Sequence, residues 1–294
     1  MSERRYHVDG EVVPAAEATV HVEDRGFRFG DGAVERLRAY GGEVFRWSAH
    51  ADRLRAACEA LGIADAVPAD LPLRVAEALE ANGLVDAAVR VHVTRGSGVG
   101  HAGAPTPPEE PEPTVVVAAE PLPRSGRDGE RAWEEPAVVG TVRQRCIPEA
   151  AVPGAERTHN ALDRVLARRE LRQAANERYQ PDEALLREGD RVVGGAASEL
   201  FWVEDGVLRT PSAEGRAPLV VRETLLDLAE GESFPVETGR FGLDAVRAAD
   251  EAFLASARWE VRPVASVDGI EAGAGPITRL LGRLYDSAVE RRCY

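Results

Sequence analysis

Residues 24–55, DRGFRFGDGAVERLRAYGGEVFRWSAHADRLR, contain the patterns from which the fold of this chain is predicted. Glycines at positions 26, 30 and 32 allow positive φ, so residues 25–32 are expected to form a tight loop. Two short apolar runs then flank Tyr40-Gly41-Gly42, which predicts a β-hairpin. Ser48 offers an N-cap, and apolar residues recur behind it at helical spacing, which predicts a helix beginning there.

Arg53 lies near the start of that predicted helix, where the helix dipole disfavours a cation. Two interpretations follow. Either an anion lies beside the Arg53 guanidinium, or Arg53 is an ordinary surface residue, and spacing alone favours the surface interpretation.

The DRGFRFGDG segment, the short hairpin and residues 50–54, HADRL, together resemble the class IV family of pyridoxal-phosphate (PLP) enzymes. That family holds branched-chain aminotransferases, D-amino-acid aminotransferases and aminodeoxychorismate lyases. The resemblance implies that Arg53 binds the cofactor phosphate. It covers nearly the whole chain, because later motifs recur in the right order. The short N-terminus and the total length are most similar to those of aminodeoxychorismate lyase or a small D-amino-acid aminotransferase.

The length of 294 residues is enough for one large or two medium domains, and 44% hydrophobic content is typical of a soluble globular protein. No apolar run approaches a membrane span, and the N-terminus lacks the apolar region of a signal peptide, so we expect a cytoplasmic protein with no membrane partner. The three cysteines are far apart and lack metal-ligand spacing, which predicts neither a disulfide framework nor a metal site.

The charge pattern is unusual. All 36 basic residues are arginine, against 50 acidic residues, for a net charge of −14. Such self-repulsion is tolerated best where salt screens it, so the composition indicates a halophile, with codon bias as the alternative. The negative charge argues against nucleic acid as a partner. A chain without lysine also has no side chain that can form a Schiff base.

The rest of the chain predicts an α+β fold with much antiparallel sheet. The expected strands cover residues 6–13 (a pair), 18–22, 87–94, 114–119, 137–145 and 252–256, with hairpins over 184–193 and 200–210. The expected helices cover residues 71–82, with Asp70 as the cap, 160–175, 221–229, 243–249 and 276–290. The resemblance implies a small α/β N-terminal domain, 1–120, a linker, 121–131, and a larger α/β pseudobarrel domain, 132–294.

The family's Schiff-base lysine precedes an asparagine by three or four residues, and the best alignment places Arg157 there, before Asn160. Arginine keeps the positive charge but stays protonated, so it is not a nucleophile at neutral pH. Some members carry a tyrosine directly after the asparagine, where this chain has Ala161.

Three further family positions are also changed. The Thr-Glu-Gly motif, followed by Ser-Asn and Phe, matches residues 193–201, which puts Gly194 at the position of the pyridinium-pairing acid. Glu199 lies five residues on and is not expected to replace that acid. The Pro-Gly-Ile-Thr-Arg phosphate loop matches residues 218–222, so Val221 replaces its threonine. A second phosphate threonine, before Glu-Ile-Thr-Pro-Val, is Ala257 in LASARWEVRPV.

Other candidate residues carry weaker signals. His159 could act as a general base, although a polar cluster at a helix start is more often a cap. Cys146 is expected to be a buried, inert thiol. Four further histidines show no metal-ligand spacing and are expected to be structural: His7, His21, His92 and His101.

Three hypotheses follow for function. The first is a non-catalytic homologue, a pseudoenzyme that keeps the scaffold for partner binding or regulation, with an active paralogue as a candidate partner. The second is a working PLP lyase or aminotransferase with an aberrant site. The third is a different enzyme that reuses the cleft without PLP. The residues predict no cofactor, with PLP expected only if the family function survives, and the resemblance implies a homodimer.

Overall fold

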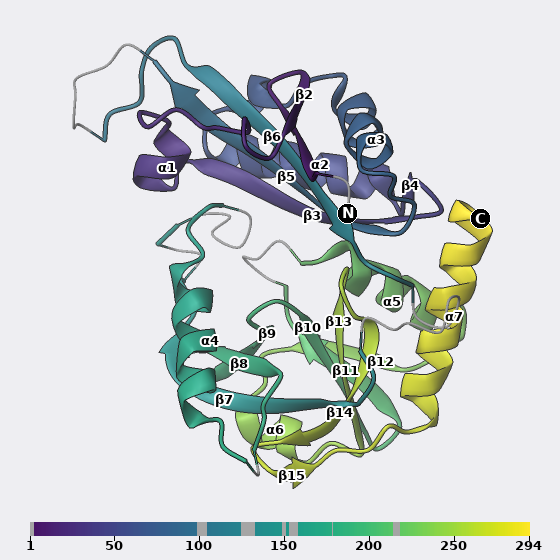
Figure 1. The fold of residues 1–294 in the computed structure, drawn as a ribbon. Helices are drawn as coiled ribbons and strands as arrows, with labels where there is room; N and C mark the ends of the chain where they lie inside the picture. The colour runs from purple at the N-terminus through teal and green to yellow at the C-terminus, as the bar shows by residue number, and fades with distance from the viewer. Residues whose placement is uncertain are drawn as a thin grey trace. The chain divides into compact units, whose positions relative to one another are not determined.

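The computed structural model describes residues 3–98, 105–124, 133–148, 151–152, 158–177, 179–213 and 218–294. The chain divides into two compact units (Figure 1). Unit 1 comprises Met1–Arg124, Gly154–Asn160 and Cys293–Tyr294, and unit 2 comprises Ser125–Pro153 and Ala161–Arg292. The linear domain limits stay a prediction, and most of the expected linker lies outside the described residues.

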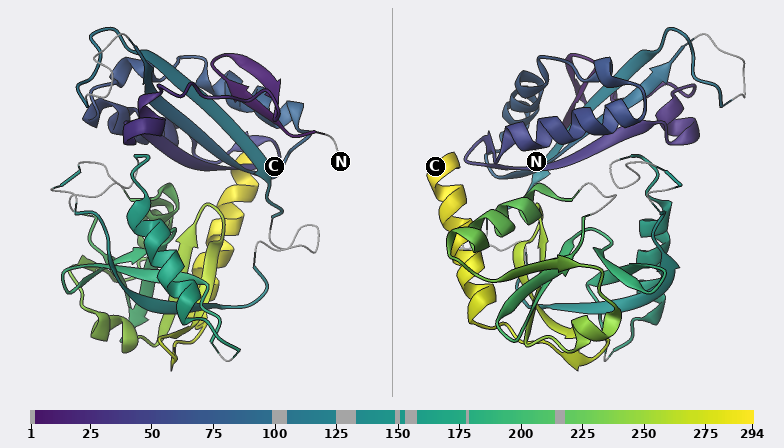
Figure 2. Two further views of the ribbon diagram at one scale, coloured as in Figure 1. Left: turned by 60° about the vertical axis from the view of Figure 1, so that its left-hand side comes forward. Right: turned by 180° about the vertical axis from the view of Figure 1, so that it is seen from behind.

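Unit 1 is built on a six-stranded antiparallel sheet with the order β2-β1-β6-β5-β3-β4. The strands are β1 (Arg5–Val8), β2 (Glu11–Pro14), β3 (Gly32–Tyr40), β4 (Glu43–Val44), β5 (Ala87–Ser97) and β6 (Glu112–Pro121). The helices are α1 (Arg25–Phe29), α2 (Trp47–Ala60), η1 (Ala64–Ala66) and α3 (Leu71–Ala81). Apolar residues of α2 and α3 pack with those of β3, β5 and β6 in one core, so both helices cover the same face of the sheet (Figure 2).

Unit 2 contains a nine-stranded mixed sheet in which β7 pairs in parallel with both β8 and β14. Its strands are β7 (Ala137–Arg145), β8 (Glu183–Glu188), β9 (Arg191–Gly195), β10 (Glu199–Glu204), β11 (Val207–Pro211), β12 (Val236–Gly239), β13 (Glu251–Ser256), β14 (Glu260–Val267) and β15 (Ile270–Glu271). Its helices are α4 (Leu162–Ala174), α5 (Val220–Gly231), α6 (Leu243–Arg247) and α7 (Pro276–Cys293). The mixed α/β class expected from the sequence is confirmed.

The turn residues in the sequence correctly predicted both of these hairpins in unit 2. The β8–β9 hairpin turns at Gly189, with φ of 58°, and the β10–β11 hairpin turns at Asp205-Gly206, with φ of 52° and 73°. These positive φ values are the ones that glycine and aspartate tolerate best. Pro276 opens α7 as predicted, because its missing N–H has no partner to lose at a first helical position.

Three local predictions near the opening motif were wrong. Residues 25–29 form the short helix α1 instead of a loop, because the Asp24 carboxylate caps it by accepting from the N–H groups of Gly26 (2.7 Å) and Phe27 (3.3 Å). Residues 18–22 form no strand. Helix α2 begins at Trp47 after Arg46, which takes a left-handed conformation, so Ser48 is inside the helix and is not its cap.

The helix expected at residues 160–175 forms as α4, and its apolar residues are only partly buried within unit 2. Ala167 and Leu171 are buried, whereas Leu162 is 64% exposed and Val165 is 59% exposed. The helix therefore packs through its Ala167–Leu171 face, and the periodicity of the sequence did not distinguish that face from the exposed apolar residues.

Candidate functional site

Arg53 is placed by α2 over the core-facing side of β3. Its side chain is 11% exposed, and its Nε lies 3.6 Å from Oε1 of Glu35, which is itself 2% exposed. His50, one turn earlier on α2, contacts the same Oε1 at 2.7 Å. The surface interpretation of Arg53 is therefore wrong. The anion beside it is a buried carboxylate of the protein, which needs a cationic partner in this core.

The charged residues of the glycine-rich segment also pair within unit 1. Asp31 accepts hydrogen bonds from Arg25 Nε at 2.8 Å and from Arg95 Nε and Nη2 at 2.8 and 3.1 Å. Burial opposes ionisation of Asp31, but the two guanidiniums outweigh it and hold the pKa of that carboxyl below its ordinary value. These contacts tie α1 to β5, so the segment has a clear structural role.

His159 lies beside His92, with Nε2 of His159 and Nδ1 of His92 3.2 Å apart. Burial lowers the pKa of both rings, to about 4 for His92, and the positive charges of Arg90 and Arg36 add to the effect at His92. The neighbouring Asn160 donates from Nδ2 to the Gly30 carbonyl at 3.1 Å. His159 is thus held in a histidine pair. Arg157, the residue at the lysine position, lies outside the described residues.

Gly194 lies in β9 with φ of 135°, opposite Leu186 of β8. The nearby acid in unit 2 is Glu183, the first residue of β8, which is fully buried. Its Oε2 accepts from Ser198 Oγ at 2.8 Å and from the Ala197 N–H at 3.2 Å. Burial raises the pKa of Glu183, against the opposing effect of Arg168 and these donors.

The other oxygen of Glu183 is also engaged. Its Oε1 accepts from the Ala184 N–H at 3.0 Å and from Arg168 Nη2 at 3.4 Å. A carboxylate with this many partners inside the protein is bonded as a structural group. Glu183 is therefore poorly suited to replace the acid that Gly194 lacks.

Val221 is buried in the first turn of α5, where the chain matches the family's phosphate loop. Glu199, at the start of β10, reaches this helix terminus, and its Oε1 accepts from the Leu219 N–H at 2.8 Å. The amino end of a helix favours an anion because its N–H groups are unpaired and its dipole is positive there. In this protein the anion is Glu199, which is 5% exposed.

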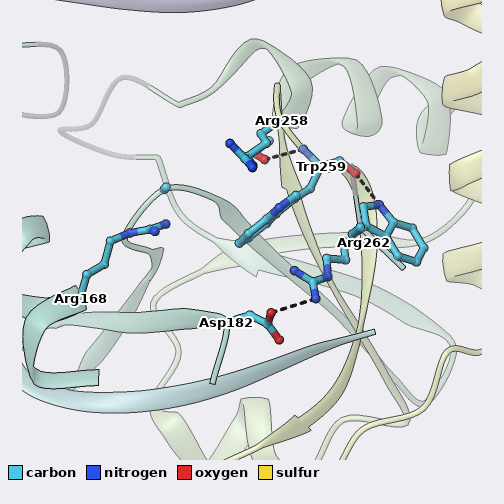
Figure 3. A pocket seen from close by; sticks show the side chains of 8 residues that line it. Arg168, Asp182, Arg258, Trp259 and Arg262 are labelled. Atoms are coloured by element: carbon cyan, nitrogen blue, oxygen red, sulfur yellow. Dashed lines mark hydrogen bonds and ion pairs between the residues drawn. The ribbon is translucent and has the colours of Figure 1, made fainter. Parts of the chain in front are cut away.

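Ala257 lies in the turn between β13 and β14, next to a pocket of about 530 Å³ in unit 2 (Figure 3). Arg168, Arg258 and Arg262 line this pocket together with Asp182, and two indoles complete its wall. The sequence patterns did not predict this pocket, because its lining residues come from separate segments of unit 2. The run of Arg258, Trp259 and Arg262 was the available signal.

Cys146 is half-buried instead of buried, just after β7, with its Sγ 3.6 Å from the Arg187 carbonyl.

Among the described residues, no group of three or more histidine, cysteine, aspartate or glutamate side chains is arranged to hold a metal ion. No helix in the described part of the chain has the length and apolar content needed to cross a membrane.

Comparison with known proteins identifies the family. The family model for amino-transferase class IV matches residues 32–267, so the chain belongs to the class IV aminotransferase family. It is 31% identical to the D-alanine aminotransferase of Listeria innocua, over 97% of this chain and 96% of that protein.

Solved structures agree with this assignment. The fold is similar to the branched-chain aminotransferase of Thermoproteus uzoniensis, with a TM-score of 0.84, 25% identity and coverage of 99% and 96%. It is also similar to the 4-amino-4-deoxychorismate lyase of Pseudomonas aeruginosa, with a TM-score of 0.79, 28% identity and coverage of 98% and 100%.

Proposed function

We propose that this protein is a repurposed member of the class IV family that forms no internal aldimine with PLP. The observation that carries the proposal is the complete absence of lysine from the chain. An aldimine needs an unprotonated amine, and a guanidinium at Arg157 remains protonated at neutral pH. The N-terminal amine is then the remaining candidate amine.

The residues around the family's cofactor positions support the same proposal, because they do not fit PLP. Gly194 has no side chain for the pyridinium nitrogen, and the acid that lies near it, Glu183, is already bonded through both oxygens. Val221 and Ala257 provide no hydroxyl for a phosphate. Glu199 places a negative charge at the α5 terminus, where it would repel a phosphate.

Arg53 is the one family phosphate residue that is kept. Its contact with the buried Glu35 gives it a structural role that does not require a phosphate. We therefore infer that the scaffold has been retained while cofactor binding has been lost. A homodimer, a cytoplasmic location and an active paralogue of the same family belong to this proposal as expectations from the family.

The test is covalent trapping. The protein is incubated with excess PLP, reduced with borohydride and weighed intact, with a lysine-containing class IV enzyme treated in parallel. We expect an adduct in the control enzyme and none in this protein beyond reaction at the N-terminal amine, which peptide mapping identifies. A stoichiometric internal adduct would contradict the proposal and favour the alternative, an active PLP enzyme with an aberrant site.

A further inference from the structure

Two arginines lie opposite one another on neighbouring parallel strands of unit 2. Arg145, the last residue of β7, is in direct register with Arg187 of β8, and Figure 1 shows these two strands side by side. Residues in direct register carry their side chains on the same face of the sheet, and the strands are about 4.8 Å apart. Like charges placed in this way repel one another and destabilise the sheet. Sheet stability therefore gives no reason for the pair.

The acidic residues that accompany these strands are already paired with other arginines. Glu170 of α4 accepts from Arg143 Nε at 3.2 Å. Glu188, the last residue of β8, accepts from Arg191 Nε at 2.8 Å. In the described part of the chain, neither guanidinium of the registered pair has a carboxylate within ion-pair distance. The pair thus keeps two positive charges that the neighbouring acids do not neutralise.

Arg187 also carries a buried donor. Its side chain is half-buried, and its Nε has no hydrogen-bond partner among the described residues, whereas Arg145 is exposed. An unpaired buried donor costs free energy, and such donors in proteins are generally satisfied. A water could accept from Nε, but it would leave the repulsion between the two guanidiniums. An anion removes both costs.

We propose that Arg145 and Arg187 form a binding site for a phosphate group. A guanidinium binds phosphate through paired hydrogen bonds, and a phosphate near pH 7 carries up to about two negative charges, one for each arginine. A carboxylate has one charge and two oxygens, which a single guanidinium satisfies. The net charge of −14 repels anions from the protein as a whole, so the affinity comes from these local contacts.

This inference goes beyond the proposed function and is independent of it. The family's positions for the cofactor phosphate lie on other elements: Arg53 on α2, Val221 on α5 and Ala257 in the turn between β13 and β14. Internal trapping of PLP would contradict the proposed function without affecting the site on β7 and β8. Conversely, failure of phosphate binding at these strands would leave the absence of an aldimine untouched.

The probe is inorganic phosphate, titrated into the full-length protein by calorimetry at constant ionic strength in potassium chloride. Glycerol 2-phosphate is the ester, and acetate is the singly charged carboxylate. We expect saturable binding of inorganic phosphate at one site and at least about tenfold weaker binding of acetate, because acetate cannot serve both guanidiniums. Binding of the ester as well supports a site for a phosphate group from either source, and its rejection supports a site for free phosphate. Acetate binding as tight as that of phosphate, or no saturable phosphate binding, would overturn the proposal.

Matched variants localise the site. Arg145→Gln and Arg187→Gln should each weaken phosphate binding at least about tenfold, as expected for loss of a charge-assisted contact. Arg143→Gln is the control, because it removes the same charge from the same strand at a side chain that is 94% exposed and already paired with Glu170. It should leave the affinity within about twofold. Equal losses in all three variants would show general electrostatics and overturn the assigned site.

Reversing one charge gives a second readout. Arg145→Glu places a carboxylate opposite Arg187, so it should raise the melting temperature in potassium chloride while abolishing phosphate binding. Because Arg145 is exposed at the end of its strand, this variant tests the site even where Arg187→Gln fails to fold. Phosphate binding by Arg145→Glu with the affinity of the parent would overturn the proposal.

Discussion

The Glu199 carboxylate accepts a hydrogen bond from the Leu219 N–H at 2.8 Å, so the amino end of α5 is neutralised by the protein itself. A buried acceptor at a helix terminus stabilises the fold through the helix dipole and through the charge-assisted hydrogen bond. We predict that Glu199→Gln lowers the free energy of unfolding by about 1–2 kcal/mol, measured by urea denaturation. Glu237→Gln, at a 52% exposed side chain paired with Arg209, is the control and should change it by less than about 1 kcal/mol. An unchanged stability in Glu199→Gln would contradict a capping role.

Arg53 should matter for folding whether or not any phosphate is present. Removing its guanidinium takes one cationic partner from the buried Glu35, which also contacts His50, so we expect Arg53→Met to cost about 2–4 kcal/mol. Arg55→Met is the matched control on the same helix, because the Arg55 side chain is 57% exposed and pairs with Asp52 at the surface. It should cost less than about 1 kcal/mol. If both variants were equally stable, Glu35 would not depend on Arg53.

The sequence predicted the elements whose signals are local. Hairpins turning at Gly189 and Gly206 and a helix opening at Pro276 follow from backbone preferences that a single residue imposes. The environment of Arg53 could not be predicted in this way, because Glu35 is 18 residues away and alternation alone does not reveal a carboxylate on the core side of β3. The same holds for Glu199 and Leu219, which meet only through the tertiary fold. Strand β14 was missed because Arg262 and Pro263 interrupt its apolar pattern.

The His92–His159 pair should make stability depend on pH. The pKa of His92 falls to about 4 in the folded protein, mainly through burial, whereas an unfolded histidine titrates near about 6.5. The unfolded state therefore binds more protons between these two pH values. The contribution of His92 to the free energy of unfolding is fully present above about pH 6.5 and is lost as the pH falls toward 4. The lowered pKa of His159 acts in the same direction.

The measurement is urea denaturation at a series of pH values for the parent and for His92→Gln. We expect the variant to lose less stability than the parent between about pH 6.5 and pH 4, by roughly 1–3 kcal/mol. His21→Gln provides the control, at an exposed histidine of unit 1, and should follow the parent curve. Identical pH profiles for the parent and His92→Gln would show that this pair does not carry the dependence.

Thermal stability should rise with potassium chloride. The net charge of −14 produces repulsion in the folded state, and raising the salt from about 0.1 M to 1 M shortens the Debye length from roughly 10 Å to 3 Å. The melting temperature is measured by circular dichroism in chloride, because sulfate stabilises many proteins by exclusion from their surfaces. A melting temperature that stays constant or falls would remove the basis for expecting a halophile.

Restoring the lysine alone should not restore turnover. Arg157→Lys returns an amine, but position 194 still lacks the acid, and each missing donor to a phosphate is worth about 1.5–3 kcal/mol. Adding Gly194→Glu carries its own cost, because the backbone at 194 has φ of 135°, where a side chain is strained by about 1–3 kcal/mol.

The combination of Arg157→Lys and Gly194→Glu with Val221→Thr and Ala257→Thr would still leave Glu199 at the α5 terminus. We therefore predict that Glu199→Asn, added to these four changes, tightens PLP binding at least about tenfold, measured by absorbance titration, because it removes a charge that opposes the phosphate. The matched control adds Glu237→Asn instead, which removes the same charge at a surface site and should leave the affinity unchanged. If Arg157→Lys alone gave the turnover of an ordinary family member, the acid and phosphate positions would have to be dispensable, and the loss of cofactor binding inferred from them would be wrong.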